Sequence, residues 1–207
     1  MVTAVKICGI TRPGDAEAAA MAGAHAIGMI FYAGSRRAIT PAVARHIVAV
    51  LPAFVTPVAL FVNPLVDEVR RITEEVGPQL LQFHGEESPE FCAQFRLPYI
   101  KAVKVRAGVD LLQCERLYAA AKGLLLDAYV DGSQGGTGTS FDWALIPARL
   151  SRPPILAGGL SPENVGDAIR RVRPWAVDVS SGVESGAGIK DPAKIAEFMR
   201  GVRNADV

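Results

Sequence analysis

A chain of 207 residues, half of them apolar and 21% charged, has the composition of a water-soluble globular protein, which excludes collagen-like and disordered classes. The formal net charge is +1 and the basic residues are scattered, so nucleic acid is not expected as a partner. No apolar run approaches the roughly 20 residues that cross a bilayer, and no secretion signal is recognised.

The three cysteines are odd in number and widely spaced, which argues against a disulfide framework and against a zinc site of paired cysteines. A reducing compartment suits such a chain, so we expect a cytoplasmic protein without contact to membranes. The length suits one hydrophobic core, and we expect a single domain over residues 1–207.

Short aliphatic runs alternate with longer segments of helical spacing about eight times, at intervals of roughly 25 residues. Most of these runs are continuously apolar, as in parallel strands that are buried on both faces. The rhythm predicts an α/β fold, a parallel eight-stranded (β/α)8 TIM barrel, with an open doubly wound sheet as the minority alternative. In chain order the expected strands are Val5–Gly9, Ala26–Phe31, Pro57–Val62, Leu80–Phe83, Ile100–Val105, Leu124–Asp127, Ile155–Ala157 and Ala176–Val179.

Helix starts are signalled after the first, second, fourth, seventh and eighth of these strands. In each case a short hydroxyl or carboxylate side chain precedes a proline, which suits the first turn of a helix. The five capping residues that this pattern predicts are Thr11, Thr40, Ser88, Ser161 and Asp191.

Reactive side chains of such barrels lie where strands end and the following loops begin. The loops after the seventh and eighth strands carry Gly158-Gly159 and Ser180-Ser181-Gly182. Glycines let backbone N–H groups approach an anion closely, and these two loops are a frequent phosphate site in barrels. A single Gly-Gly would indicate only a tight turn, but two such loops at the expected strands predict phosphate binding.

Cys8 and Asp127 end the first and sixth strands, and each alone would be read as a packing or turn residue. Together they face each other across the barrel mouth, where one can take a proton while the other gives one. Lys6 lies two residues before Cys8 and points to the same side of the strand. Its ammonium either favours the Cys8 thiolate or pairs with a carboxylate deeper in the barrel.

Arg37 follows the second strand and is the candidate for binding a substrate carboxylate, a role that its neighbour Arg36 also fits. His84 ends the fourth strand and is the only histidine at a strand end, which leaves a metal site without support. Cys92 and Cys114 fall in helices and are interpreted as packing residues. The glycine-rich segment 132–138 after the sixth strand is either a lid or a plain loop.

Taken in order, these residues resemble the phosphoribosylanthranilate isomerase family of tryptophan biosynthesis. Each matching segment is a weak signal alone, but the ordered set covers nearly the whole chain and is specific. The segments are Lys6–Thr11, Phe31, Ser35–Arg37, Gln82–Glu86, Leu126–Asp127, Gly135–Gly138, Phe141–Trp143, Leu156–Leu160, Pro162–Asn164, Asp178–Glu184 and Lys190–Asp191.

The resemblance implies a cofactor-free Amadori rearrangement of N-(5-phosphoribosyl)anthranilate to 1-(2-carboxyphenylamino)-1-deoxyribulose 5-phosphate, which is an intramolecular aldose–ketose isomerisation. It implies that Cys8 is the general base and Asp127 the general acid. No metal or cofactor is implied, and the partner is the small phosphorylated substrate. The residues expected to bind that substrate are Arg37, His84, Gly158, Gly159, Asp178, Ser180, Ser181 and Gly182.

Two other functions are weighed against this one. The related barrel isomerase of histidine biosynthesis performs the same rearrangement on another substrate, and it is expected to carry an aspartate where Cys8 stands. A non-catalytic phosphate-binding barrel would not need both Cys8 and Asp127. The sequence leaves open whether the protein is a monomer or a homodimer.

Overall fold

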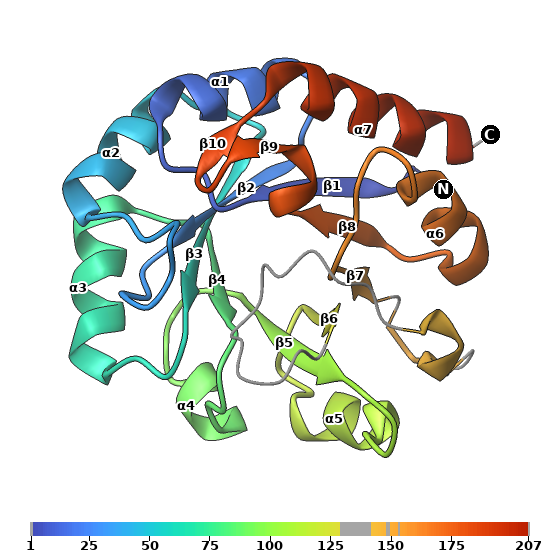
Figure 1. The fold of residues 1–207 in the computed structure, drawn as a ribbon. Coiled ribbons are helices and arrows are strands. Elements are labelled where there is room, and N and C mark those ends of the chain that lie inside the picture. Colours follow the sequence, from blue (N-terminus) through green and yellow to red (C-terminus); the bar gives the residue numbers. More distant parts are fainter. Residues whose placement is uncertain (1, 129–141, 148–149, 153, 207) are drawn as a thin grey trace.

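The computed structural model describes residues 2–128, 142–147, 150–152 and 154–206, and eight parallel strands in it close into a barrel (Figure 1). Each strand pairs with its sequence neighbours, and β1 pairs with β8 to complete the closure. The predicted barrel and all eight predicted strands are confirmed. The strands are β1 Ala4–Cys8, β2 Ala26–Ile30, β3 Thr56–Phe61, β4 Leu80–Phe83, β5 Tyr99–Val105, β6 Gly123–Ala128, β7 Ile155–Leu156 and β8 Ala176–Val179.

Helices surround the barrel on its outside (Figure 1). They are α1 Pro13–Met21, α2 Pro41–Ala49, α3 Val66–Val76, α4 Pro89–Ala93, α5 Leu111–Leu117, α6 Val165–Val172 and α7 Pro192–Ala205. Between β6 and β7, the described residues form a single 3₁₀ turn, η1 Trp143–Leu145. The glycine-rich segment 132–138, interpreted from the sequence as either a lid or a plain loop, lies outside the described residues.

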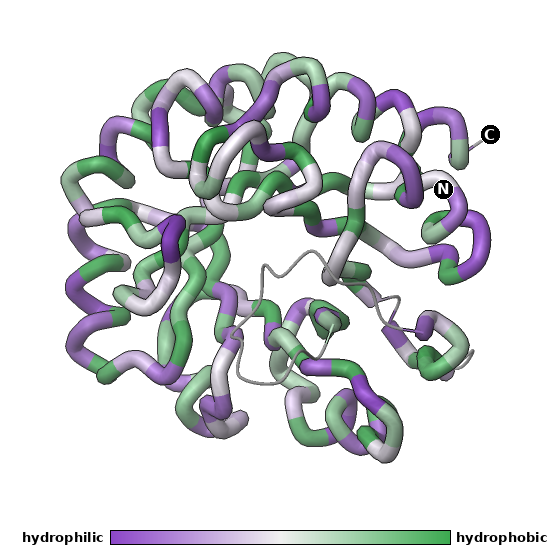
Figure 2. The backbone as a smooth tube through the Cα atoms, viewed as in Figure 1, coloured by the Kyte–Doolittle hydropathy of each residue, from purple (hydrophilic) through white to green (hydrophobic). Residues whose placement is uncertain are grey.

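The main core lies between the strands and the helices, where apolar side chains of the strands pack against the buried faces of the helices. A chain of aromatic contacts runs through it, with ring centroids of Phe31 and Phe61 5.7 Å apart and those of Phe61 and Phe83 6.2 Å apart. Figure 2 shows the corresponding pattern, with hydrophobic and hydrophilic stretches alternating around the helical ring. Among the described residues, no helix combines the length and hydropathy that crossing a membrane requires.

Several strands also carry buried polar side chains, which an apolar core alone would not explain. Lys6 of β1, Gln82 of β4, Lys101 of β5, Asp127 of β6 and Asp178 of β8 are all less than a tenth exposed. Burying polar and charged groups is costly unless they find partners. Their partners are polar groups of neighbouring strands and of the loops that follow them, such as Asp178 for Lys6 and Glu87 for Lys101.

Three of the five predicted helix caps are confirmed. Thr40, Ser88 and Asp191 accept hydrogen bonds from backbone N–H groups in the first turns of α2, α4 and α7. The other two predictions of a capping residue were wrong. Helix α1 begins after Arg12, because the Thr11 hydroxyl donates instead to the backbone oxygen of Gly188.

The second wrong cap is Ser161, because α6 starts later, after Asn164. The Oδ1 atom of Asn164 accepts a hydrogen bond from the Ser161 backbone at 2.8 Å. Its Nδ2 atom donates to the Gly159 oxygen at 2.8 Å, so Asn164 stabilises the loop after β7.

A short antiparallel hairpin that the sequence did not predict lies between β8 and α7. After the 3₁₀ turn η2 (Ser181–Val183), strand β9 (Glu184–Gly186) pairs with β10 (Ile189–Lys190). The hairpin lies outside the barrel sheet, beside the carboxyl end of β1 (Figure 1).

Candidate active site

A cavity opens at the carboxyl ends of the strands. Six of the eight strands, or the loops that follow them, contribute titratable side chains, other polar side chains or glycines to its wall. The lining consists of Cys8, Ile30, Tyr32, Ser35, Arg37, Leu60, Val62, His84, Asp127, Ala157, Gly158, Gly159, Leu160, Asp178, Val179, Ser180 and Ser181.

The cavity brings together nearly all residues that the sequence singled out, because both predicted acid–base residues and all but one of the predicted binding residues line it. The exception is Gly182, which lies in η2 against the neighbouring loop. A β-carbon on Gly182 would be 2.0 Å from the Leu160 oxygen. Of the two arginines, Arg37 lines the cavity and Arg36 is exposed to solvent.

Cys8 and Lys6 lie side by side at the end of β1, as their spacing predicts. A β-carbon on Gly28 of β2 would lie 2.8 Å from the Cys8 Sγ atom and 3.0 Å from the Lys6 Nζ atom, so this glycine leaves the room that the pair occupies. The Lys6 Nζ atom also donates to Asp178 Oδ1 at 2.9 Å. The sequence analysis left open whether Lys6 lies beside Cys8 or pairs with a carboxylate, and in the structure it does both.

Two opposing effects act on the Cys8 thiol. Burial raises its pKa, because a thiolate is poorly solvated in the barrel, and the Lys6 ammonium acts in the opposite direction. The net result is a pKa above the usual value for cysteine. For Lys6, burial lowers the pKa, but Asp178 and Cys8 outweigh it and the pKa is raised, so Lys6 is a cation.

Asp127 is held by its neighbours at the end of β6. Its Oδ1 atom accepts a hydrogen bond from the Ala128 backbone at 2.9 Å, and its Oδ2 atom lies 3.0 Å from His84 Nε2. On the other side of the ring, Gln82 Nε2 lies 2.9 Å from His84 Nδ1. An amide nitrogen only donates, so in this arrangement Nδ1 accepts and the Nε2–H group donates to Asp127.

The Gln82 side chain retains an unused acceptor. It is fully buried, and no donor among the described residues reaches its Oε1 atom. As placed, the Gln82 amide favours the His84 tautomer whose Nε2–H group faces Asp127.

The loops after β7 and β8 have the backbone conformations that close approach requires. Gly158 and Gly159 have φ angles of 81° and 64°, in the left-handed region that favours glycine. A β-carbon on Gly158 would meet the Ala128 nitrogen at 2.5 Å and Asp127 Oδ1 at 2.9 Å. Glycine at this position therefore lets the loop after β7 lie directly against Asp127.

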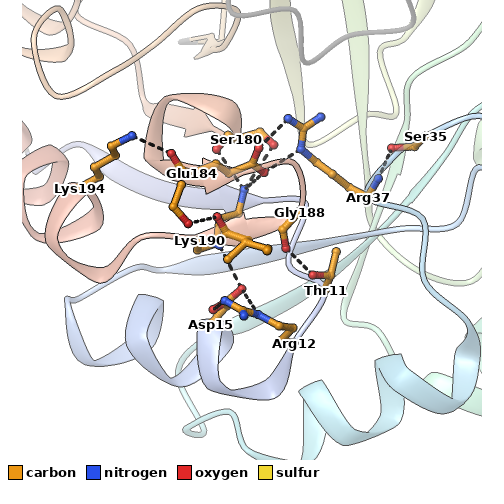
Figure 3. A network of polar contacts seen from close by, with 12 residues as sticks. Thr11, Arg12, Asp15, Ser35, Arg37, Ser180, Glu184, Gly188, Lys190 and Lys194 are labelled. Carbon is orange, nitrogen blue, oxygen red and sulfur yellow. Dashed lines mark hydrogen bonds and ion pairs between the residues drawn. The ribbon is translucent and has the colours of Figure 1, made fainter.

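Arg37 is held over the end of β1 by a carboxylate from the unpredicted hairpin. Its Nε and Nη2 atoms donate to Glu184 Oε1 and Oε2 at 2.7 and 2.8 Å. The buried Lys190 donates to the same Oε1 atom at 2.8 Å (Figure 3). Sequence reasoning did not assign a role to either residue, although two charged residues flanking a short glycine-containing hairpin were a signal for it.

We also searched the described residues for side chains that could ligate a metal ion. No group of three or more histidine, cysteine, aspartate or glutamate side chains among them has an arrangement that holds one. The polar groups of the cavity are instead suited to proton transfer and to binding of anions.

Comparisons with known proteins agree on one family. Residues 5–201 match the family model of N-(5'-phosphoribosyl)anthranilate (PRA) isomerase. A relative from Nitrosospira multiformis, named N-(5'-phosphoribosyl)anthranilate isomerase, is 60% identical over 198 residues, which cover 96% of this chain and 95% of that protein.

Solved structures lead to the same family. Phosphoribosyl anthranilate isomerase from Thermotoga maritima superposes with a TM-score of 0.90 at 40% identity, covering 98% and 99% of the two chains. A complex of such an isomerase with reduced 1-(o-carboxyphenylamino)-1-deoxyribulose 5-phosphate has a TM-score of 0.85 at 40% identity, with 98% and 99% coverage. Another structure, at 0.85 and 39% with the same coverage, describes monomers generated from the dimeric Thermotoga maritima enzyme.

Proposed function

The chain belongs to the N-(5'-phosphoribosyl)anthranilate isomerase family, and we propose that Cys8 and Asp127 are the base and the acid of its reaction. The enzyme acts in tryptophan biosynthesis and rearranges N-(5-phosphoribosyl)anthranilate to 1-(2-carboxyphenylamino)-1-deoxyribulose 5-phosphate. The observation that carries the proposal is that Cys8 and Asp127, from β1 and β6, line one cavity together with anion-binding groups.

The first step assigned to this site is ring opening. Asp127 in its protonated form donates to the ribose ring oxygen, the C1–O bond breaks, and the nitrogen lone pair forms a C1=N bond. His84 holds the Asp127 carboxyl group through its Oδ2 atom. The His84 Nε2–H group donates to this Oδ2 atom, so the proton that moves to the substrate is carried by the other carboxyl oxygen, and the hydrogen bond from His84 persists in the carboxylate that remains.

The second step is removal of the C2 proton by the Cys8 thiolate. The electrons of the C2–H bond form a C1=C2 bond and neutralise the iminium nitrogen, which gives an enolamine. Tautomerisation of this enolamine to the ketone completes the rearrangement. The buried Lys6 ammonium beside Cys8 supports the thiolate against the cost of burial.

The remaining groups bind the two ends of the substrate. Arg37 pairs with the anthranilate carboxylate, for which a guanidinium has matching geometry. The backbone around Gly159 and the turn Ser180–Ser181 bind the phosphate, since these small residues leave N–H groups open to an anion. Gly158 and Gly182 keep the two loops in place, and Asp178 orients Lys6.

Such a reaction needs no external electron acceptor, because C2 is oxidised while C1 is reduced within one molecule. We therefore propose a cofactor-independent aldose–ketose isomerase that works in the cytoplasm as a monomer or a homodimer. The test follows the loss of the intrinsic fluorescence of freshly generated substrate by protein dialysed against a chelator. Undiminished turnover is expected, and activity that returns only after a metal or cofactor is added would contradict the proposal.

A further inference from the structure

Arg37 reaches the cavity along a path that the backbone keeps free. A β-carbon on Gly9, at the end of β1, would lie 2.5 Å from the Arg37 Cδ atom and 3.0 Å from the Ser180 hydroxyl. The Arg37 side chain and the turn after β8 therefore meet above this glycine. The Arg37 backbone is held as well, because its N–H group donates to the Ser35 hydroxyl at 3.1 Å.

Glu184 fixes the plane of the Arg37 guanidinium. The two parallel hydrogen bonds join Nε and Nη2 to the two oxygens of one carboxylate, which is the most directional form of this ion pair. Side chains of Arg37 and Glu184 are only 13% and 5% exposed, so water competes weakly for these bonds. The Nη1 amino group of Arg37 takes no part in these two hydrogen bonds.

Lys190 leaves this cluster with a surplus of positive charge. Its Nζ atom donates to Glu184 Oε1 at 2.8 Å and to the Ser180 oxygen at 3.0 Å, and its side chain is fully buried. One carboxylate is thus shared by two cations beside the cavity (Figure 3). A second carboxylate, brought by a ligand, would restore the balance of charge.

The hairpin that carries Glu184 is itself anchored on two sides. Lys194 of α7 donates to the Glu184 backbone oxygen at 2.7 Å. The Lys190 backbone N–H donates to Asp15 of α1 at 3.1 Å, and the Thr11 hydroxyl donates to the Gly188 oxygen. These bonds fix the position of the Glu184 backbone, and its side chain passes that position on to Arg37.

We propose that Glu184 is a positioning residue that sets the selectivity of the site for a carboxylated aromatic ring, by holding the Arg37 guanidinium with one amino group turned to the ligand. This inference rests on the proposed role of Arg37. Lys190 completes the arrangement by keeping the Glu184 carboxylate charged and in place. The β9–β10 hairpin is the support on which this selectivity depends.

The test measures what the ring carboxylate contributes to binding. Inhibition constants are determined for the reduced product, 1-(2-carboxyphenylamino)-1-deoxyribulose 5-phosphate after reduction, and for the same compound with an unsubstituted phenyl ring. The selectivity ratio is the inhibition constant of the phenyl compound divided by that of the carboxylated compound. This ratio is compared in wild type, Arg37→Met, Glu184→Gln and the double variant. Ser185→Ala, in the same hairpin but exposed, is the control and should keep the wild-type ratio.

We expect Glu184→Gln to reduce the ratio by roughly tenfold or more, with the affinity for the uncarboxylated compound little changed. In the Arg37→Met background, Glu184→Gln should change nothing further, because a positioning residue acts through its partner. Equal weakening of both compounds, or the same loss in both backgrounds, would overturn the inference.

The failure of the two proposals is distinguishable. If Arg37→Met keeps the wild-type ratio, the carboxylate role of Arg37 is wrong and the inference falls with it. If Arg37→Met lowers the ratio to about one while Glu184→Gln keeps the wild-type ratio, only the proposed role of Glu184 is wrong. Should Glu184→Gln fail to fold, Glu184→Asp keeps the charge beside Lys190 with a shorter reach. A reduced ratio in that variant supports the inference, and a wild-type ratio overturns it.

Discussion

The Nε2 atom of His84 lies 3.0 Å from the Oδ2 atom of Asp127, and both side chains are 9% exposed. Although the sequence suggested His84 as a substrate-binding residue, this contact makes Asp127 its immediate partner. A residue that orients the acid affects the chemical step more than binding. Replacing His84 therefore distinguishes a role in binding substrate from a role in orienting Asp127.

Replacing His84 by Asn should lower kcat by about 10–100-fold, the kinetic equivalent of one hydrogen bond to a charged group. KM should change little, because the substrate contacts remain. Steady-state kinetics with the fluorescent substrate measure both constants. His46→Asn, on the exposed face of α2, is the control. A variant whose loss lies mainly in KM would show that His84 binds substrate directly.

Lys6→Met should move the rising limb of kcat/KM to more alkaline pH. In its proposed role as the base, Cys8 acts as a thiolate, which forms as pH rises through the Cys8 pKa. Burial and Asp178 raise that pKa, whereas Lys6 and Lys190 lower it, so removing the Lys6 charge raises it further.

The pH profile of kcat/KM for Lys6→Met is compared with that of Lys122→Met, a substitution of an exposed lysine. The control should reproduce the wild-type profile. An unmoved limb in Lys6→Met would mean that Lys6 only pairs with Asp178, which is its other neighbour.

Gly28→Ala should impair catalysis in a protein that still folds. Its new β-carbon would lie 2.8 Å from the Cys8 Sγ atom, closer than van der Waals contact allows, so the thiol must move. Misplacing a reacting group by a fraction of its size costs on the order of 10²-fold in rate. Gly14→Ala, where the new β-carbon meets nothing within 4 Å, should keep full activity. Equal activities of the two variants would show that the position of Cys8 is not critical.

The buried ion pair of Lys101 and Glu87 predicts a loss of stability. Lys101 Nζ lies 3.1 Å from Glu87 Oε2 and also donates to the Gly85 oxygen at 2.6 Å, with both side chains almost fully buried. Lys101→Met leaves the Glu87 charge without its partner, and we expect the free energy of unfolding to fall by about 3–5 kcal/mol.

Urea denaturation measures this loss. The matched control is Arg71→Met, which breaks the half-exposed pair with Glu75 and should cost under about 1 kcal/mol. If both variants lose the same small amount, the Lys101–Glu87 pair does not stabilise the loop that follows β4.

The barrel and the residues at its mouth were predictable from local patterns. Most strands are short, largely apolar runs, and the chemistry of a barrel is confined to the strand ends. Cys8, Arg37 and Asp127 all follow from that rule. The capping residues were less certain, because the Thr11 hydroxyl has a competing partner in Gly188, which is 177 residues away.

The contacts that organise the site were not predictable, because they join distant parts of the chain. Glu184 and Arg37 are separated by 147 residues, and His84 and Asp127 by 43. The hydrophobic periodicity of a sequence does not indicate which distant residues will form such a contact. The β9–β10 hairpin was missed for a related reason, since strands of three and two residues are too short to carry an alternating pattern.

The most direct measurement compares single-turnover loss of substrate fluorescence in wild type, Cys8→Ser and Asp127→Asn, with Cys114→Ser as a control outside the cavity that Cys8 lines. We expect rapid turnover by wild type and control. In the two site variants we expect losses of about 10²–10⁴-fold, with unchanged circular dichroism. Near-wild-type turnover by either Cys8→Ser or Asp127→Asn would contradict the assignment of that residue as a proton-transfer group.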